Sequence, residues 1–218
     1  LLPSFNVQRL PAADGQAFVR PATLRALSAD HTLVLVNGRR FHRSALLGSR
    51  GAQAPDLAGI PNLAVGQIEV LRDGASAQYG SDAIAGVVNI ILDEKPGMHA
   101  VSQVSRYYAG DGTEYLVGLR GGARLGDRGF LSFTGEWNKQ NATSRTRQRP
   151  DAIAFQAANP TLAVPNPVQR WGQPDLESIK GSASLRFELA PKAEFHAFAI
   201  AQQGEGVTDF NWRNPATT

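Results

Sequence analysis

The stretch from Ile68 to Leu92, IEVLRDGASAQYGSDAIAGVVNIIL, decides the fold more than any other part of this chain of 218 residues. Both of its ends are short apolar runs of the kind that form strands. Between them Asp73-Gly74 supplies a turn, and the Ala- and Ser-rich piece that ends at Tyr79-Gly80 indicates a short helix. The stretch predicts a strand, a turn, a helical piece, a Gly-rich turn and a strand, with Glu69 and Arg72 as charged residues on an apolar framework.

The residues before this stretch complete a mixed α/β unit. The run 33–36 is wholly apolar and ends at Asn37-Gly38, which predicts a strand buried on both faces and followed by a turn. Residues 56–61 predict a helical turn that begins at an aspartate cap and ends at a proline. Lys95-Pro96-Gly97 then breaks the pattern, and we place a domain boundary there, so that the first domain is residues 1–97.

Beyond this boundary the apolar period changes to two, which is the period of a half-buried strand. The alternation is cleanest in residues 177–189 and loosest in residues 99–108. Each segment has about the length that a tilted transmembrane strand needs. The five candidate strands are residues 99–108, 113–125, 130–138, 177–189 and 193–203.

The connections between these strands have two lengths. Three are tight turns, at residues 109–112, 126–129 and 190–192, and the fourth is a long polar loop at residues 140–174. In an outer-membrane barrel the inner turns are short and the outer loops are long. If the first strand runs outward, the turns near Gly126 and Ala190 lie inside and the long loop lies outside.

Aromatic side chains at strand ends agree with this orientation. Tyr107 and Tyr108 end the first strand and Trp137 ends the third, both at the expected outer interface, whereas Phe130 begins the third strand at the inner one. A half-exposed antiparallel sheet with aromatic residues at its edges is the alternative.

Composition excludes several classes of protein. With 42% apolar and 19% charged residues the chain can bury a core, and with no Cys it has no disulfide framework. The net charge is only +3 and the Lys residues are scattered, so the charge pattern does not favour nucleic-acid binding. The longest apolar run, residues 83–92, is far shorter than the roughly 18 residues of a membrane helix. The first residues lack the pattern of a signal peptide, so we expect one to have been removed or the chain to be truncated.

The opening stretch, residues 68–92, carries a motif that resembles that of TonB-dependent outer-membrane receptors. It consists of a strand ending in Leu71-Arg72, the piece ending in Tyr79-Gly80 and the run Ala85–Ile90, and the likeness extends from Pro3 into the later strands. Asp73-Gly74 stands where many members have Gly-Pro. The resemblance implies an α+β plug domain followed by antiparallel strands of a transmembrane β-barrel. The plug motif residues are Asn37, Gly38, Glu69, Tyr79, Gly80, Gly86 and Asn89.

The resemblance also implies the extent of each part. Residues 1–97 would be the plug domain without its N-terminal part, and residues 98–218 would be the first strands, about five of 22. We therefore expect an internal fragment of a receptor that lacks the segment contacting TonB.

Two arginines match the family's plug–barrel latch. By position these are Arg25 and Arg72, although Ala26 replaces the Gly of the family's Arg-Gly-aliphatic element. Arginine stays charged and forms bidentate pairs with carboxylates. A latch of this kind would therefore fix the position of the plug relative to the barrel. Their partners would lie on later strands outside this chain. The alternative is that Arg72 is a surface residue at a strand end and that Arg25 caps a helix-like turn.

No catalytic constellation stands out, so we expect no enzyme, no cofactor and no bound metal. Gly80-Ser81-Asp82 lacks the second glycine of a nucleophile elbow, and the four His residues are widely dispersed. Arg145, Arg147 and Arg149 in the long loop could attract lipopolysaccharide or an anionic metal chelate by electrostatic steering. The alternative is a solvated loop.

The resemblance implies active uptake of a scarce nutrient, with ferric siderophores as the commonest substrate class. The expected partners are TonB, outer-membrane lipid and lipopolysaccharide, and a small molecule such as a metal chelate, in the outer membrane of a Gram-negative cell. One alternative is a soluble periplasmic binding or signalling module with a plug-like fold. Another is a hydrolase on a β-sandwich, which would need the catalytic set that is missing.

Overall fold

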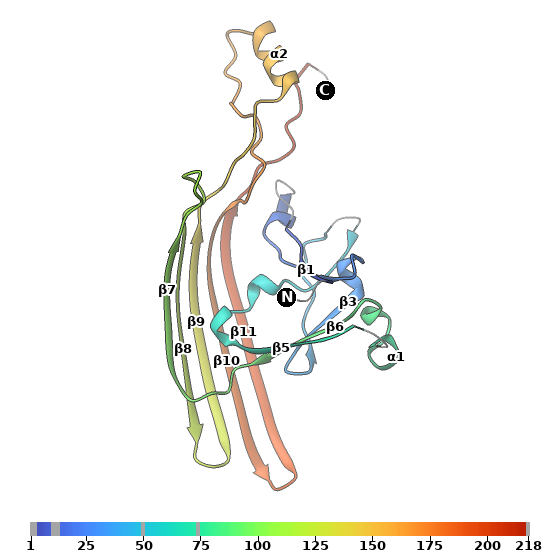
Figure 1. Cartoon of the computed structure of the whole chain (residues 1–218), viewed down its shortest axis with the longest axis vertical. Coiled ribbons are helices and arrows are strands. Elements are labelled where there is room, and N and C mark those ends of the chain that lie inside the picture. Colours follow the sequence, from blue (N-terminus) through green and yellow to red (C-terminus); the bar gives the residue numbers. More distant parts are fainter. Residues whose placement is uncertain (1–3, 10–13, 49–50, 73–74, 217–218) are drawn as a thin grey trace.

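The computed structural model describes residues 4–9, 14–48, 51–72 and 75–216, and it contains two units (Figure 1). The smaller unit, called the plug below, packs against one face of a long curved sheet, called the wall. The strands of the plug are β1 Phe5–Val7, β2 Ala22–Leu24, β3 Thr32–Val36, β4 Arg39–Arg40, β5 Val65–Leu71 and β6 Gly86–Leu92. Its helix is α1 Ala75–Tyr79, and its 3₁₀ turns are η1 Asp14–Ala17, η2 Ala29–His31, η4 Leu57–Gly59, η5 Asn62–Ala64 and η6 Ser81–Ala83.

The plug is built on a four-stranded sheet in the order β4-β3-β6-β5. Strands β3 and β6 are parallel and central, and every residue of β3 is buried. A strand covered on both faces needs a continuous apolar run, which confirms the prediction for residues 33–36. One face packs against β2 and η5 through Val34, Val36, Val88 and Ile90, and the other covers α1 and η6 through Leu33, Leu35 and Val87.

The turn predicted at residues 56–61 is also present. It is the 3₁₀ turn η4, and the Asp56 carboxylate caps it by accepting a hydrogen bond of 2.9 Å from the backbone N–H of Ala58. The same carboxylate accepts a bond of 2.8 Å from the N–H of Arg20. The cap therefore also joins η4 to the chain that precedes β2.

The wall is a five-stranded antiparallel sheet in the order β11-β10-β9-β8-β7, so each strand pairs with its neighbour in sequence. The structure confirms all five predicted strands. Their bounds are β7 Gly97–Ser105, β8 Glu114–Leu125, β9 Gly129–Gln140, β10 Asp175–Ala190 and β11 Ala193–Val207. The turns at residues 126–128 and 191–192 lie at one end of the sheet, and the long loop lies at the other (Figure 1).

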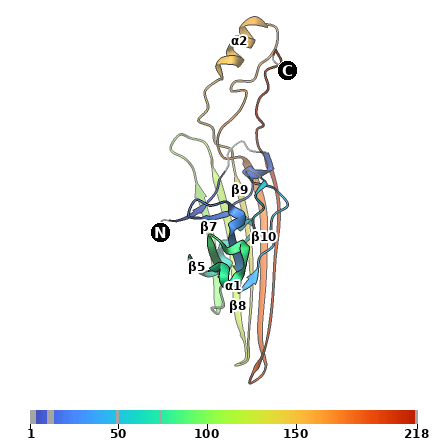
Figure 2. The same ribbon diagram turned by 90° about the vertical axis from the view of Figure 1, so that its right-hand side faces the viewer.

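The two faces of the wall invert the arrangement of a water-soluble protein. On β9 the polar residues Ser132, Thr134 and Glu136 are buried toward the plug, whereas Leu131 and Phe133 on the opposite face are exposed. Figure 1 shows the plug on one side of the sheet only, and Figure 2 views the molecule from that side. Strand β11 differs, because its inward residues Phe198 and Ile200 are apolar and pack against the core of the plug. The looser alternation of residues 193–203 has this cause.

Two details at the end of the wall that carries the long loop correct the sequence predictions. Strand β7 ends at Ser105, so Tyr107 and Tyr108 lie in a loop of residues 106–113 and do not end the strand. The reason is local: the Arg106 guanidinium donates to the carbonyl of Gly110, and the Tyr107 N–H donates to the carbonyl of Asp111, which curls the chain. The long loop also contains a helix that was not predicted, α2 Pro150–Ala158. Its proline start and the aspartate in its first turn were visible in the sequence.

Within the part of the chain that the structure describes, no helix has the length and apolar character needed to cross a membrane.

Candidate functional site

Four of the predicted motif residues lie close together on the plug sheet, across β5, β6 and the turn between β3 and β4. The Asn89 amide donates to a Glu69 carboxylate oxygen at 3.0 Å, and its carbonyl oxygen accepts from the N–H of Gly38 at 3.0 Å. The Asn37 side chain accepts from the N–H of Leu92 at 2.8 Å. Asn37 and Gly38 have positive φ values of 46° and 74°, as a tight turn between β3 and β4 requires. The network ties this turn to β6 and β5, so these residues fix the plug sheet.

The glycines Gly80 and Gly86 of the motif lie where the backbone has a positive φ, and Gly86 also lies close to another backbone segment. Gly80 has φ +89° at the end of α1. Gly86 has φ +140°, and a Cβ there would lie 2.4 Å from the carbonyl oxygen of Leu71. Tyr79 packs on the smaller core cluster, and its carbonyl oxygen accepts from Arg40 at 2.6 Å. These residues position the elements of the plug.

The two arginines matched to the latch lie on the plug. Arg25 follows β2 with φ 57°, and its N–H donates to the carbonyl of Ser4 at 3.0 Å. Arg72 follows β5, and both residues are exposed. Their pairing with carboxylates on later strands stays a prediction.

A buried polar contact between the plug and the wall involves residues that the sequence did not single out. The Glu136 side chain on β9 is 0% exposed, and it accepts from the backbone N–H of Asn62 at 2.8 Å. Its other oxygen accepts from the ammonium group of Lys180 at 2.8 Å, and Lys180 lies directly opposite on β10. The alternation of β9 places Glu136 on the inner face. Its buried ion pair needs the plug to exclude water, which no local pattern reveals.

Small residues let the plug approach closely around this contact. A Cβ at Gly118 on β8 would lie 3.1 Å from the Leu63 side chain. A Cβ at Gly59 would lie 2.9 Å from the Gln202 amide oxygen on β11. We call residues 59–64 and the wall residues that they touch the plug–wall seam.

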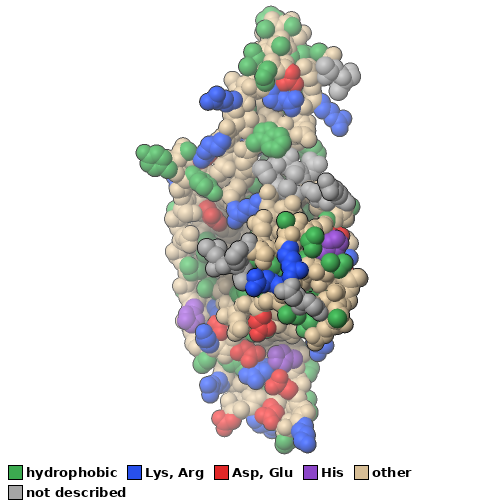
Figure 3. Space-filling view, turned by 45° about the vertical axis from the view of Figure 1, so that its right-hand side comes forward, with side chains coloured by type: hydrophobic (Ala, Val, Ile, Leu, Met, Phe, Trp, Pro, Cys, Tyr) green, Lys and Arg blue, Asp and Glu red, His purple; other side chains and the backbone are tan. Residues whose placement is uncertain are grey.

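A second group of contacts holds the linker between β6 and β7, residues 93–96. The Arg120 side chain on β8 is 1% exposed, and its guanidinium donates to the carbonyl oxygens of Asp93 and Lys95, both at 2.8 Å. The Asp93 carboxylate also lies 3.4 Å from Arg120 Nε. Arg186 on β10 pairs with Glu94 at 2.8 Å. Charged side chains of both signs gather on the wall below the plug (Figure 3).

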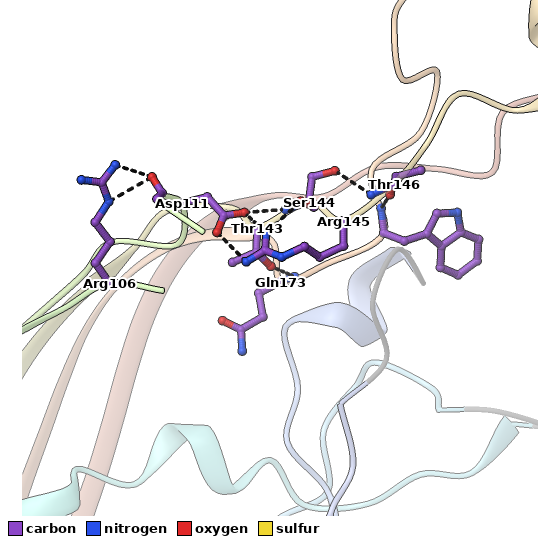
Figure 4. A network of polar contacts seen from close by, with 9 residues as sticks. Arg106, Asp111, Thr143, Ser144, Arg145, Thr146 and Gln173 are labelled. Atoms are coloured by element: carbon purple, nitrogen blue, oxygen red, sulfur yellow. Dashed lines mark hydrogen bonds and ion pairs between the residues drawn. The ribbon is translucent and has the colours of Figure 1, made fainter. Parts of the chain in front are cut away.

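The three arginines of the long loop have different surroundings. Arg145 binds Asp111 of the first outer loop, and the Asp111 carboxylate also accepts from the Ser144 N–H at 3.0 Å (Figure 4). Arg149 pairs with Asp151 at 3.0 Å and lies over the Trp212 ring. Arg147 is exposed. Two of the three therefore contribute to the structure of the outer loops.

The contact between Asp111 and Arg145 gives a testable pH dependence. Hydrogen bonding to Arg145, and then to Ser144, lowers the pKa of Asp111 to about 2. A lowered pKa means that the contact is complete above the usual carboxyl pKa of about 4 and is lost as the pH falls toward 2. We expect Asp111→Asn to speed hydrogen exchange of the Ser144 amide at neutral pH, and the parent to show the same loss only below about pH 4.

Hydrogen exchange followed by mass spectrometry tests this. Asp127→Asn, in a turn at the opposite end of the wall, is the control and should leave the Ser144 region unchanged. Equal exchange in the parent and in Asp111→Asn would contradict the prediction.

The comparisons with known proteins agree with this geometry. Residues 1–87 match the TonB-dependent Receptor Plug Domain family. The chain is also 39% identical over 233 residues to the vitamin B12 transporter BtuB of Photobacterium profundum, across 94% of this chain and 36% of that protein. The chain belongs to the TonB-dependent receptors. This confirms the family and the fold class inferred from the sequence.

Solved structures show the same fold. The ferric enterobactin receptor PfeA of Pseudomonas aeruginosa superimposes with a TM-score of 0.65 at 20% identity, over 94% of this chain and 30% of that one. The siderophore receptor PirA of Acinetobacter baumannii gives 0.64 at 22% identity, over 94% and 28%. The chain thus spans about a third of the length of the TonB-dependent receptors that it matches.

In this receptor chain a cavity of about 230 Å³ lies between the plug and the outer end of the wall. Arg9 and Arg20 line it from the plug, and Thr143 and residues 172–174 line it from the wall side. Burial and the nearby Arg9 guanidinium lower the pKa of Arg20, whereas the Asp56 carboxylate raises it. Figure 4 shows the Gln173 side chain pointing away from the network around Asp111. The Arg20 guanidinium donates to the carbonyl oxygens of Ala17 and Val19, and the positive charges of the two arginines suit an anionic, oxygen-rich ligand.

Among residues 4–9, 14–48, 51–72 and 75–216, no group of three or more His, Cys, Asp or Glu side chains could hold a metal ion.

Proposed function

We propose that this chain serves the active uptake of a scarce nutrient across the outer membrane, with residues 1–97 as plug and residues 98–218 as barrel strands. The observation that carries the proposal is the inverted wall, whose polar face carries the plug and whose apolar face is bare. Val117, Leu119 and Phe133 on the bare face are 42% to 54% exposed. An apolar surface of this extent is stable against lipid and a liability in water.

A soluble periplasmic module is the alternative, and a mass measurement separates the two. The receptor expressed from its whole gene should run in outer-membrane fractions as a band that shifts on boiling, because closed barrels resist unfolding by detergent. A soluble band that does not shift would overturn the membrane assignment. In the proposed receptor this chain takes part in binding and transport and catalyses no reaction. TonB would supply the energy, and lipopolysaccharide would surround the outer rim.

For the substrate we propose a ferric siderophore. The cavity with Arg9 and Arg20 supports an anionic chelate, and PfeA and PirA are siderophore receptors by name. Vitamin B12 is the second candidate, because the curated relative is a vitamin B12 transporter. The two candidates differ in charge: tris-catecholate iron chelates are anionic, whereas cyanocobalamin carries no net charge.

We expect Arg9→Gln to weaken binding of ferric enterobactin about tenfold or more and to leave binding of cyanocobalamin unchanged. A hydrogen bond to a charged group contributes about 1.5–3 kcal/mol, which corresponds to tenfold or more in affinity. Equilibrium binding to the purified receptor measures both ligands. Arg124→Gln, at an exposed arginine near the opposite end of the wall, is the matched control. Tight binding of cyanocobalamin together with no binding of ferric enterobactin would contradict the siderophore proposal.

A further inference from the structure

The seam contact at Glu136 can open without leaving a charge unpaired. Of its two partners, Asn62 belongs to the plug and Lys180 belongs to the wall. If residues 59–63 withdraw, the Glu136–Lys180 pair remains on the wall and becomes hydrated, and the N–H groups of Asn62 meet water. The change exchanges the two hydrogen bonds from Asn62 to Glu136 for bonds to water.

The contact at Arg120 behaves differently, because its acceptors all lie on the linker. They are the carbonyl oxygens of Asp93 and Lys95, and the Asp93 carboxylate forms an ion pair with the same guanidinium at 3.4 Å. Arg120 Nη1 is buried and lacks a hydrogen-bond partner among the described residues. Withdrawal of the linker would therefore break both hydrogen bonds and the ion pair of Arg120 at once, whereas Glu136 keeps its ion pair with Lys180.

The linker is fixed at further points. A Cβ at Gly122 on β8 would lie 2.5 Å from the carbonyl oxygen of Lys95, so wall and linker are in direct contact. The Asp93 N–H donates to the carbonyl of Ala64 at 2.8 Å, which joins the linker to the end of η5. On the other side of the linker, Glu94 is paired with Arg186.

We propose that the plug turns about linker residues 93–95, which Arg120 and Arg186 keep on the wall, while residues 59–63 leave the wall at Glu136. The proposal rests on the proposed transport function, since only a plug that is displaced needs a pivot. In this proposal Glu136 and Arg120 both position the plug on the wall, but only one of the two contacts opens during transport. Glu136 forms the contact that releases, and Arg120 forms the contact that stays.

Disulfides test this, because the 218 residues of this sequence contain no Cys. A Cβ at Gly118 would lie 3.1 Å from a Leu63 methyl carbon across the seam and 3.1 Å from a Val101 methyl carbon within the wall. Leu63→Cys with Gly118→Cys therefore bridges plug and wall, whereas Val101→Cys with Gly118→Cys bridges only wall strands. Oxidation should reduce uptake of ferric enterobactin at least tenfold in the first variant and leave the second unchanged, and reduction should restore the first.

The pivot is tested by a tether at the linker. In Glu94→Cys with Arg186→Cys, a short bis-thiosulfonate reagent replaces the ion pair with a covalent link. We expect uptake to continue with this tether in place. Loss of uptake on tethering, or undiminished uptake with the 63–118 disulfide closed, would overturn the proposal.

Thiol labelling separates a failed pivot from a failed transport function. A membrane-impermeant maleimide should label the single variant Leu63→Cys faster in cells that have TonB than in cells that lack it. The single variant Glu94→Cys should be labelled equally in both. This labelling pattern supports the pivot even if ferric enterobactin is not the substrate. An equal labelling rate of Leu63→Cys in both cells overturns the pivot, whatever the uptake.

Discussion

Glu136→Ala is expected to weaken the hold of the wall on the plug by about 3 kcal/mol. The substitution leaves the Lys180 ammonium, 11% exposed, without its carboxylate and the Asn62 N–H without its acceptor. Removal of one member of a buried ion pair costs about 3–5 kcal/mol, because the remaining charge stays buried. Lys180 lies near the lower end of that range because it retains some access to water.

Protease digestion of the purified receptor in urea measures this effect. The urea concentration at which the plug becomes cleavable should fall by about 1 M or more, given about 1–3 kcal/mol per molar urea for domains of this kind. Glu177→Ala is the matched control, because Lys139 and Glu177 also lie 2.8 Å apart but are 47% and 48% exposed. An exposed pair contributes about 0–1 kcal/mol, so the control should move little.

The double variant Glu136→Leu with Lys180→Met separates charge from packing. Replacement of both charges by apolar groups removes the unpaired cation, so part of the lost stability should return. If Glu136→Ala and Glu177→Ala shift the digestion midpoint equally, Glu136 does not hold the plug.

Gly86→Ala is expected to prevent the plug from folding at its normal place on the wall. The backbone at Gly86 has φ +140°, a region that residues with a Cβ rarely adopt. The new Cβ would lie 2.4 Å from the Leu71 carbonyl oxygen and 2.9 Å from a Leu24 methyl carbon, and a backbone oxygen cannot turn aside. Backbone strain alone costs about 1–3 kcal/mol, and the overlap adds to it.

The same protease assay without urea tests this expectation. The plug of Gly86→Ala should be cleaved at a rate close to that of the unfolded chain. Gly38→Ala provides the control, because φ is +74° there and nothing lies within 4 Å of the new Cβ. That change should cost only about 1–2 kcal/mol. Equal sensitivity of the two variants would mean that the close approach at Gly86 does not limit folding.

Much of the fold could be read from the sequence because strand periodicity is a local property. The buried run 33–36 and the alternation in residues 130–138 each correspond to a strand. The helix α2 was missed, because a short helix inside a polar loop has no long apolar period. The end of β7 was misplaced by the loop hydrogen bonds of Arg106, which a strand pattern does not encode.

The candidate site was predictable only in part. The motif pointed to Asn37, Gly38, Glu69 and Asn89, and the structure brings these four together in one network. The pairing of Arg25 and Arg72 with carboxylates stays a prediction. Arg145 and Arg149 could be recognised as loop residues, but their pairing with Asp111 and Asp151 required the folded loops.

By itself, the sequence determined the family, the α+β plug followed by β-strands, and which face of each strand is polar. These follow from side-chain chemistry and from spacings of a few residues. Only the tertiary structure decided which polar side chains on the inner face of the wall contact the plug. Glu136 and Lys180 are separated by 44 positions, and Asn62 and Glu136 by 74. Such contacts depend on the register of strands and on water being excluded between plug and wall, and neither is a property of a local segment.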